Sequence, residues 1–129
     1  MALFRYRYAA DNPPAPSVLL NVVHPVTAAE RRDVAALVDT GADQSVLPAA
    51  VADALGLTRL DGEEVVGFDG TPVDVPTARV LLQVRDLPPL DLEVLVSEHV
   101  PDAVVGRDVL NRYTLTLDGP AGLLTITDD

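Results

Sequence analysis

The stretch Ala36-Leu37-Val38-Asp39-Thr40-Gly41-Ala42-Asp43 joins an apolar strand to a carboxylate held in a tight Thr-Gly turn. The apolar residues before Asp39 predict a buried strand, and Gly41 predicts a turn in which the backbone approaches the carboxylate closely. A carboxylate buried at a strand end is unfavourable unless it is hydrogen-bonded, paired or used in chemistry. The stretch therefore predicts a functional site at Asp39.

The composition predicts one folded domain. The chain has 129 residues, of which 48% are hydrophobic, and its mean hydropathy is +0.23. These values are typical of a chain that buries a core. Aromatic residues make up only 4%, whereas 11 Pro and 8 Gly punctuate a Val- and Leu-rich sequence. This pattern favours short strands and sharp turns, so we expect an all-β or mostly β domain over residues 1–129.

The charge balance argues against two classes of partner. The formal net charge is −11, and all nine basic residues are Arg. Such a field repels phosphate backbones and anionic lipid, so we expect neither nucleic acid nor a membrane as a partner. Without cysteine, the chain can form neither disulfides nor a thiolate metal site. No apolar run approaches a membrane span and no secretory leader is recognisable, so we expect a cytoplasmic protein.

Hydrophobic alternation and turn residues predict most of the secondary structure. A Pro-rich connector within residues 1–16 follows an edge strand. Pro48 and Gly56 bracket a helix at Pro48–Leu55, and a second helix is expected at Arg107–Arg112. The dipeptide Asp69-Gly70 predicts a hairpin turn. The expected strands are Phe4–Tyr8, Ser17–Val23, Asp33–Val38, Val65–Phe68, Thr71–Val75, Arg79–Val84, Asp91–Val96, Thr114–Leu117 and Leu123–Thr127.

Two segments, Leu37–Asp43 and Val104–Leu110 (Val-Val-Gly-Arg-Asp-Val-Leu), carry a family resemblance. They resemble the two signatures of the retropepsin-like (retroviral-type) aspartic proteases, and the resemblance extends from Ser17 to Ile126. The hairpin at Val65–Val75 lies where this family has its flap. The helix at Pro48–Leu55 is more similar to cellular and bacterial members than to the viral enzymes. The resemblance implies a closed retropepsin-like β-barrel with a flap hairpin, one short helix after the active-site loop and a C-terminal helix.

The chemistry of an aspartic protease requires two carboxylates that share one proton. This chain contains a single Asp-Thr-Gly sequence, and Asp43 lies too close along the same turn to face Asp39. The second carboxylate must therefore come from another copy across a two-fold axis, so the hypothesis requires a homodimer. Its substrate would be a protein or peptide, and neither a cofactor nor a metal is expected.

The resemblance also assigns roles to individual residues. Asp39 is the expected catalytic residue, and Arg107 is expected to pair with Asp43. Because Ala42 cannot donate a hydrogen bond to an ionised carboxylate, we expect activity at mildly acidic to near-neutral pH. The expected active-site loop is Thr40, Gly41, Ala42 and Asp43; its supports are Gly106, Arg107 and Asp108; and the expected flap and substrate pocket are Val46, Val66, Gly67, Phe68, Asp69, Gly70 and Val104.

Several alternatives stay open at this stage. A dimeric peptide- or protein-binding module without catalysis is the competing function. His24 and His99 are isolated along the chain, which favours surface roles over metal binding. The family often places dimer-interface strands near the C-terminus, where Asp128 and Asp129 of two copies would repel each other. The dimer is therefore expected to be held differently from the viral one. Occupation of the cleft by the strand Phe4–Tyr8 is a less favoured possibility.

Overall fold

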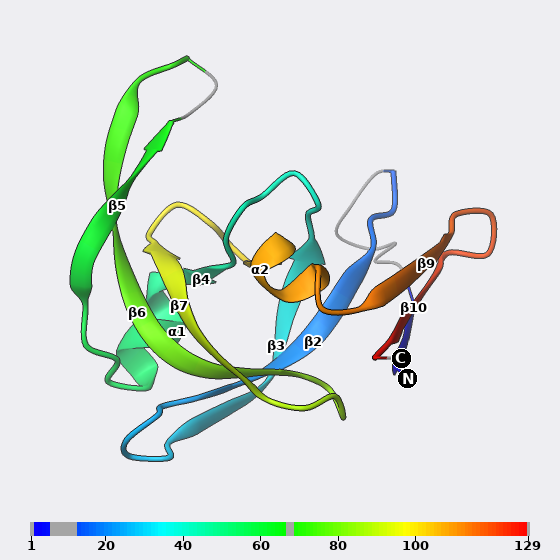
Figure 1. Ribbon diagram of the computed structural model, residues 1–129, viewed down its shortest axis with the longest axis horizontal. Coiled ribbons are helices and arrows are strands. Elements are labelled where there is room, and N and C mark those ends of the chain that lie inside the picture. The colour runs from blue at the N-terminus through cyan, green and yellow to red at the C-terminus, as the bar shows by residue number, and fades with distance from the viewer. Residues whose placement is uncertain (1, 6–12, 67–68, 129) are drawn as a thin grey trace.

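Ten strands and two short helices make up the part of the chain that the structure, a computed structural model, describes: residues 2–5, 13–66 and 69–128 (Figure 1). In chain order they are β1 (Ala2–Arg5), β2 (Ser17–Val23), β3 (Glu30–Val38), β4 (Val46–Pro48), α1 (Ala49–Ala54), β5 (Leu60–Val66), β6 (Pro72–Val84), β7 (Leu90–Ser97), β8 (Ala103–Val105), α2 (Arg107–Leu110), β9 (Thr114–Asp118) and β10 (Leu123–Thr127).

Six strands close into a barrel. The larger sheet has the order β2-β3-β8-β4-β7-β6-β5, and an additional antiparallel pairing of β2 with β6 closes its first six strands. Among the described residues, strand β5 pairs only with the first half of β6, so the two form a hairpin that projects from the barrel (Figure 1). The structure thus confirms the expected mostly β class, the closed barrel and the flap hairpin.

The barrel interior is filled by alternate aliphatic residues of its strands, because successive side chains of a strand point to opposite faces. On β2, Val18, Leu20 and Val22 are buried, and β6 contributes Ala78, Val80, Leu82 and Val84. Each fully buried Val or Leu side chain stabilises the fold by about 1.5–3 kcal/mol relative to exposure. A smaller sheet of order β1-β10-β9 adds Phe4, Leu124 and Ile126 to the same core.

Several predicted elements match closely. Strands β2 and β10 have the predicted bounds, and β2 and β3 form the expected antiparallel hairpin. Helix α1 begins at Ala49, one residue after the predicted start at Pro48, which occupies the N-cap position, and Gly56 follows the helix with a φ of 65°. Helix α2 ends at Leu110, two residues earlier than predicted. Strand β1 lies at a sheet edge as expected, but it begins at Ala2; its predicted continuation through Tyr8 lies outside the described residues.

Strand β3 begins at Glu30, three residues before its predicted start at Asp33, because the polar residues there carry no strand signal. Asp33 has a φ of 56°, and the register of β3 against β2 shifts between Leu20 and Val22. A bulge of this kind lets a ladder continue through residues that break the hydrophobic alternation. The short strand β4 also went unpredicted, because three residues carry no periodic signal.

The two predicted strands Thr71–Val75 and Arg79–Val84 are one continuous strand, β6, with Pro76 inside it. Proline cannot donate to a ladder, so it is tolerated only where a hydrogen bond is not required. Opposite Pro76 the register of β5 shifts between Leu60 and Glu63. At Gly62 a Cβ atom would lie only 2.1 Å from the Val75 carbonyl oxygen and 3.0 Å from the Pro76 nitrogen. The close approach of Gly62 at this irregularity accommodates Pro76 and marks the base of the hairpin.

Candidate active site

The Asp39 turn lies at the end of β3, where the chain leaves the barrel. The Asp39 amide donates to the Val105 carbonyl (3.0 Å), and the Gly41 amide donates to Asp39 Oδ1 (2.9 Å). The Ala42 amide closes the turn on the Asp39 carbonyl (3.2 Å). These bonds fix both the backbone and one carboxylate oxygen of Asp39. The sequence predicted that this carboxylate is buried, and this prediction is wrong for the single chain. Asp39 and Thr40 are exposed, because the turn projects beyond the barrel strands that could cover it.

Arg107, the first residue of α2, holds this turn in place. Its amide donates to the Ala42 carbonyl (2.9 Å), and its Nη1 donates to the Thr40 carbonyl (2.7 Å). Its Nη2 forms an ion pair with Asp43 Oδ1. The guanidinium therefore divides its donors between the Asp43 carboxylate, its expected partner, and the Thr40 carbonyl. One side chain thus binds both flanks of the Thr40–Asp43 turn.

A second connection between turn and helix is more deeply buried. Asp108 accepts hydrogen bonds from the Ser45 amide (2.9 Å) and hydroxyl (2.7 Å), and from the Val109 amide (3.0 Å). The Ser45 hydroxyl oxygen in turn accepts from the Gly106 amide (3.0 Å). Ser45 is 1% exposed, so these bonds satisfy groups that water does not reach. Ser45 is consequently a structural residue, and the sequence pattern did not show its bond to Asp108.

Gly106 is the point at which α2 and the active-site turn pack backbone against backbone. A Cβ atom here would lie 2.8 Å from the Gln44 carbonyl carbon and 2.9 Å from the Ala42 carbonyl oxygen. Real Cβ atoms essentially never approach other atoms so closely. A side chain at this position would therefore displace the turn that carries Asp39.

A cavity of about 510 Å³ opens beside this turn. Its floor is the active-site segment with β4 and β7, and its other wall is the flap strand β5. The lining residues are Gly41, Ala42, Asp43, Gln44, Val46, Glu63, Glu64, Val65, Val66 and Leu95. The cavity is therefore an open groove between the active-site turn and the flap, and its lining includes Gly41, whose amide binds the Asp39 carboxylate.

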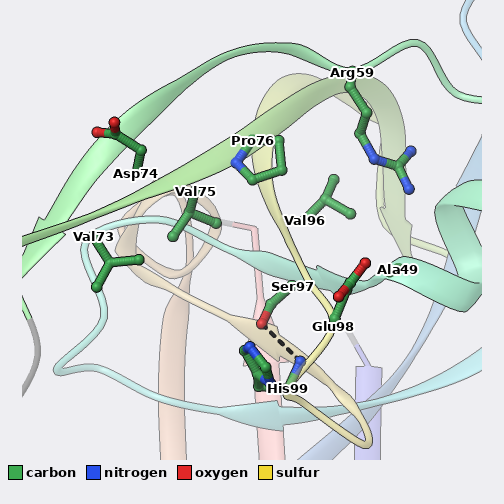
Figure 2. Close-up of a pocket in the computed structure, with 10 residues that line it drawn as sticks. All are labelled: Ala49, Arg59, Val73, Asp74, Val75, Pro76, Val96, Ser97, Glu98 and His99. Carbon is green, nitrogen blue, oxygen red and sulfur yellow. Dashed lines mark hydrogen bonds between the residues drawn. The ribbon is translucent and has the colours of Figure 1, made fainter.

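A smaller cavity of about 240 Å³ lies on the other side of the flap base (Figure 2). Figure 2 shows Val73, Val75 and Pro76 of β6 facing Ser97 and His99, which follow β7. The His99 amide donates to Ser97 Oγ (3.1 Å), and the His99 side chain is exposed. Val73, Val75 and Pro76 form an apolar wall of this cavity and belong to the flap strand β6. The cavity therefore lies between the base of the flap and the barrel.

The family follows from the comparison with known proteins. The model of the family described as "gag-polyprotein putative aspartyl protease" matches residues 25–112. The chain belongs to this family. The match includes the Asp39 turn, the flap hairpin and α2, and thus covers every element that lines the larger cavity.

Solved structures with the same fold agree with this assignment. EIAV protease complexed with the inhibitor HBY-793 is 24% identical, with a TM-score of 0.58, covering 75% of this chain and 86% of the other. A retropepsin-like aspartic protease from Rickettsia conorii is 14% identical, with a TM-score of 0.61 and coverages of 95% and 88%. The retroviral protease-like domain of Ddi1 from Leishmania major is 18% identical, with a TM-score of 0.50 and coverages of 88% and 89%. No curated protein sequence matches the chain.

The structure of this aspartyl protease family member places the predicted site residues in two groups. The Asp39 turn, Gly106, Arg107 and Asp108 form one bonded unit, and Val46 and Val66 line the larger cavity. Asp69, Gly70 and Val104 do not line it among the described residues, and Gly67 and Phe68 lie outside them. The remaining lining residues, Gln44, Glu63, Glu64, Val65 and Leu95, were not predicted from the sequence. Glu63 and Glu64 precede Val65 without any alternation of apolar and polar residues, so no strand signal reaches them, and the place of Leu95 depends on the parallel pairing of β4 with β7.

The turn of the flap is held by Asp69, whose Oδ1 accepts the Thr71 amide (2.9 Å). This hydrogen bond stabilises the ionised carboxylate and lowers the pKa of Asp69 from its ordinary value. The described flap turn is therefore supported by an ionised Asp69 at neutral pH.

Burial raises the pKa of Tyr113, which packs against the core after α2.

The described residues contain neither a metal-binding cluster nor a membrane-spanning helix. Within residues 2–5, 13–66 and 69–128, no group of three or more His, Asp or Glu side chains is arranged to hold a metal ion. In the same described residues, no helix is long and apolar enough to cross a membrane. His24, one of the two histidines, uses Nδ1 to accept the Val26 (3.1 Å) and Thr27 (3.2 Å) amides of its own turn. Its role in the structure is that of a turn cap.

Proposed function

We propose that this chain is an aspartic endopeptidase that acts as a homodimer on protein or peptide substrates. The observation that carries the proposal is the exposed Asp39 carboxylate, oriented by the Gly41 amide beside a groove of about 510 Å³. An exposed carboxylate at the barrel end is accessible to the Asp39 of a second copy. Membership of the aspartyl protease family supports the same assignment.

In the proposed mechanism the two Asp39 carboxylates of the dimer share one proton, because two like charges in contact cannot both stay ionised. The ionised member takes a proton from a water molecule, and the resulting hydroxide attacks the scissile carbonyl carbon. The protonated member donates its proton to the carbonyl oxygen, which gives a tetrahedral diol. The diol collapses as the amide nitrogen accepts the proton that was taken from water, the C–N bond breaks, and one diol hydroxyl gives its proton to the other carboxylate, which restores the singly protonated pair. The products are a carboxylic acid and an amine, and no covalent enzyme intermediate forms.

The groove supports an extended substrate. A peptide lying between β5 and the active-site floor can form main-chain hydrogen bonds while alternate side chains enter pockets. Val46, Val65 and Leu95 provide apolar walls, which favours apolar side chains beside the cleaved bond. Glu63 and Glu64 also line the groove and are exposed, so they disfavour acidic side chains there by like-charge repulsion.

The test compares wild type with Asp39→Asn on a diverse peptide mixture from acidic to neutral pH, with products identified by sequencing. The substitution keeps the shape of the side chain but removes its ability to ionise, so cleavage should be lost. Asp86→Asn is the matched control, because Asp86 is exposed in the turn between β6 and β7, away from the groove lining. Cleavage that survives Asp39→Asn, or its absence from wild type at every pH, would contradict the proposal. Peptide binding without cleavage would identify the chain as a binding module instead.

A further inference from the structure

The larger cavity carries polar groups on both its flap wall and its floor, and their chemistry indicates which side chains it accepts. Glu63 of β5 and Gln44 of the active-site segment both line it. We propose that the groove selects peptides that carry a lysine or arginine at one position, where Glu63 binds the cationic side chain. The inference rests on the proposed function, because the peptide in the groove is the substrate of that reaction.

Strand alternation places Glu63 on the inner face of the flap. Successive side chains of a strand point to opposite faces, so Glu63 shares its face with Val65. Val65 is half-buried, whereas Val66 on the opposite face is 64% exposed. The pairing partner of Glu63 on β6 is Val75, which is also half-buried. The covered face of the hairpin is therefore the face that carries Glu63.

The negative charge of the groove is not balanced by a cation of the described chain. Among the described residues, the lining contains Asp43, Glu63 and Glu64 but no basic residue. Arg107 pairs with Asp43, whereas none of the described ion pairs includes Glu63. The hairpin segment 60–78 contains five acidic residues and no basic one, so it cannot supply the cation itself. A cationic group of the substrate is therefore attracted to this wall.

The floor of the groove supplies an uncharged acceptor in a fixed orientation. Gln44 Nε2 donates to the Glu93 carbonyl (2.9 Å), although the two residues are 49 positions apart. A carbonyl oxygen only accepts, so this bond determines which end of the Gln44 amide faces Glu93 and leaves the amide oxygen to accept from a ligand. Gln44 is half-buried and lines the cavity. Two elements far apart in the sequence thus present acceptors to one groove.

A lysine or arginine side chain matches this arrangement in both of its parts. Its apolar stem can pack against Val46, Val65 and Leu95, which also line the groove. Its cationic head carries only donors, which suit the Glu63 carboxylate and the Gln44 amide oxygen. An apolar side chain would leave both acceptors without a partner, and an acidic one would be repelled. The groove is therefore complementary to a long basic side chain.

Matched peptides test the proposal. The parent is a peptide of the mixture above that wild type cleaves or binds, and each of its positions is replaced in turn by lysine, by uncharged norleucine or by glutamate. At one position the lysine peptide should exceed the norleucine peptide about fivefold in kcat/KM, as expected for a partly exposed ion pair. The preference should fall as the salt concentration rises, because salt screens the charges. A wild type that shows no such position would overturn the proposal.

Two charge-neutralising variants separate a local contact from the general field of a chain with net charge −11. In Glu63→Gln the lysine preference should fall to about twofold or less, while the norleucine peptide is cleaved as by wild type. Glu98→Gln is the matched control, because Glu98 is exposed and lines the smaller cavity instead (Figure 2). It should keep the preference. Equal loss in both variants, or no loss in Glu63→Gln, would contradict the proposal.

Peptide binding gives a second measurement that does not depend on catalysis. In the Asp39→Asn background the lysine peptide should bind about fivefold more tightly than the norleucine peptide, and adding Glu63→Gln should remove this difference. A Glu63-dependent binding preference without cleavage by wild type would refute the protease and leave the selectivity. Asp39-dependent cleavage without a lysine preference would refute the selectivity alone. The absence of both cleavage and preference would refute both proposals.

Discussion

The contact between Gly106 and the active-site turn allows the effect of Gly106→Ala to be worked out in advance. The added Cβ would lie 2.8 Å from the Gln44 carbonyl carbon and 2.9 Å from both the Ala42 and Gln44 carbonyl oxygens, against about 3.4 Å for an ordinary contact. These are backbone atoms, so the turn and α2 must separate by about 0.5 Å. Overpacking of this kind costs about 1–3 kcal/mol of unfolding free energy. The shift also displaces Asp39, and misplacement of a catalytic group by about 1 Å can cost roughly 100-fold in rate.

The measurement is urea unfolding followed by circular dichroism, together with kcat/KM on a peptide that wild type cleaves. The matched control is Gly119→Ala in the turn between β9 and β10, because a Cβ there meets nothing within 4 Å. The control should be neutral or slightly stabilising, since replacing Gly where the backbone permits reduces the entropy of the unfolded chain. A Gly106→Ala variant with the unfolding free energy and activity of the control would refute the reasoning from close packing.

Three further predictions concern the same site. Asp108→Ala leaves the buried amide and hydroxyl of Ser45 without their acceptor and should lower the unfolding free energy by about 1–3 kcal/mol, measured by urea unfolding; a change below about 0.5 kcal/mol would contradict the assigned network. Gly62→Ala forces a Cβ against the Val75 carbonyl and should speed amide exchange in the flap and lower kcat/KM; unaltered flap exchange would count against it. Ala42→Ser adds a donor beside the ionised Asp pair and should move the acidic limb of the pH–rate profile to lower pH, whereas an unchanged or raised limb would disprove this.

Local patterns in the sequence predicted much of the fold. Alternation of apolar residues located β2 and β10 with their observed bounds, and Pro48 with Gly56 located α1. These signals succeed because the period of a strand and the capping of a helix depend on neighbouring residues. The same local patterns gave no signal for β4 and predicted β6 as two separate strands. In β6 the tolerance of Pro76 depends on Gly62 in another strand, which local patterns do not report.

Some features of the candidate site were likewise predictable from local sequence, and others were not. The segments Leu37–Asp43 and Val104–Leu110 by themselves determined the carboxylate, its turn and its supporting helix, because each is a contiguous motif. Only the tertiary structure decided which donors of Arg107 bind which oxygens, and that Ser45 pairs with Asp108 across 63 positions of sequence. It also decided that Glu63 and Leu95 meet in one groove. These features arise from strand register and close packing, which bring distant residues together and which no local spacing in the chain encodes.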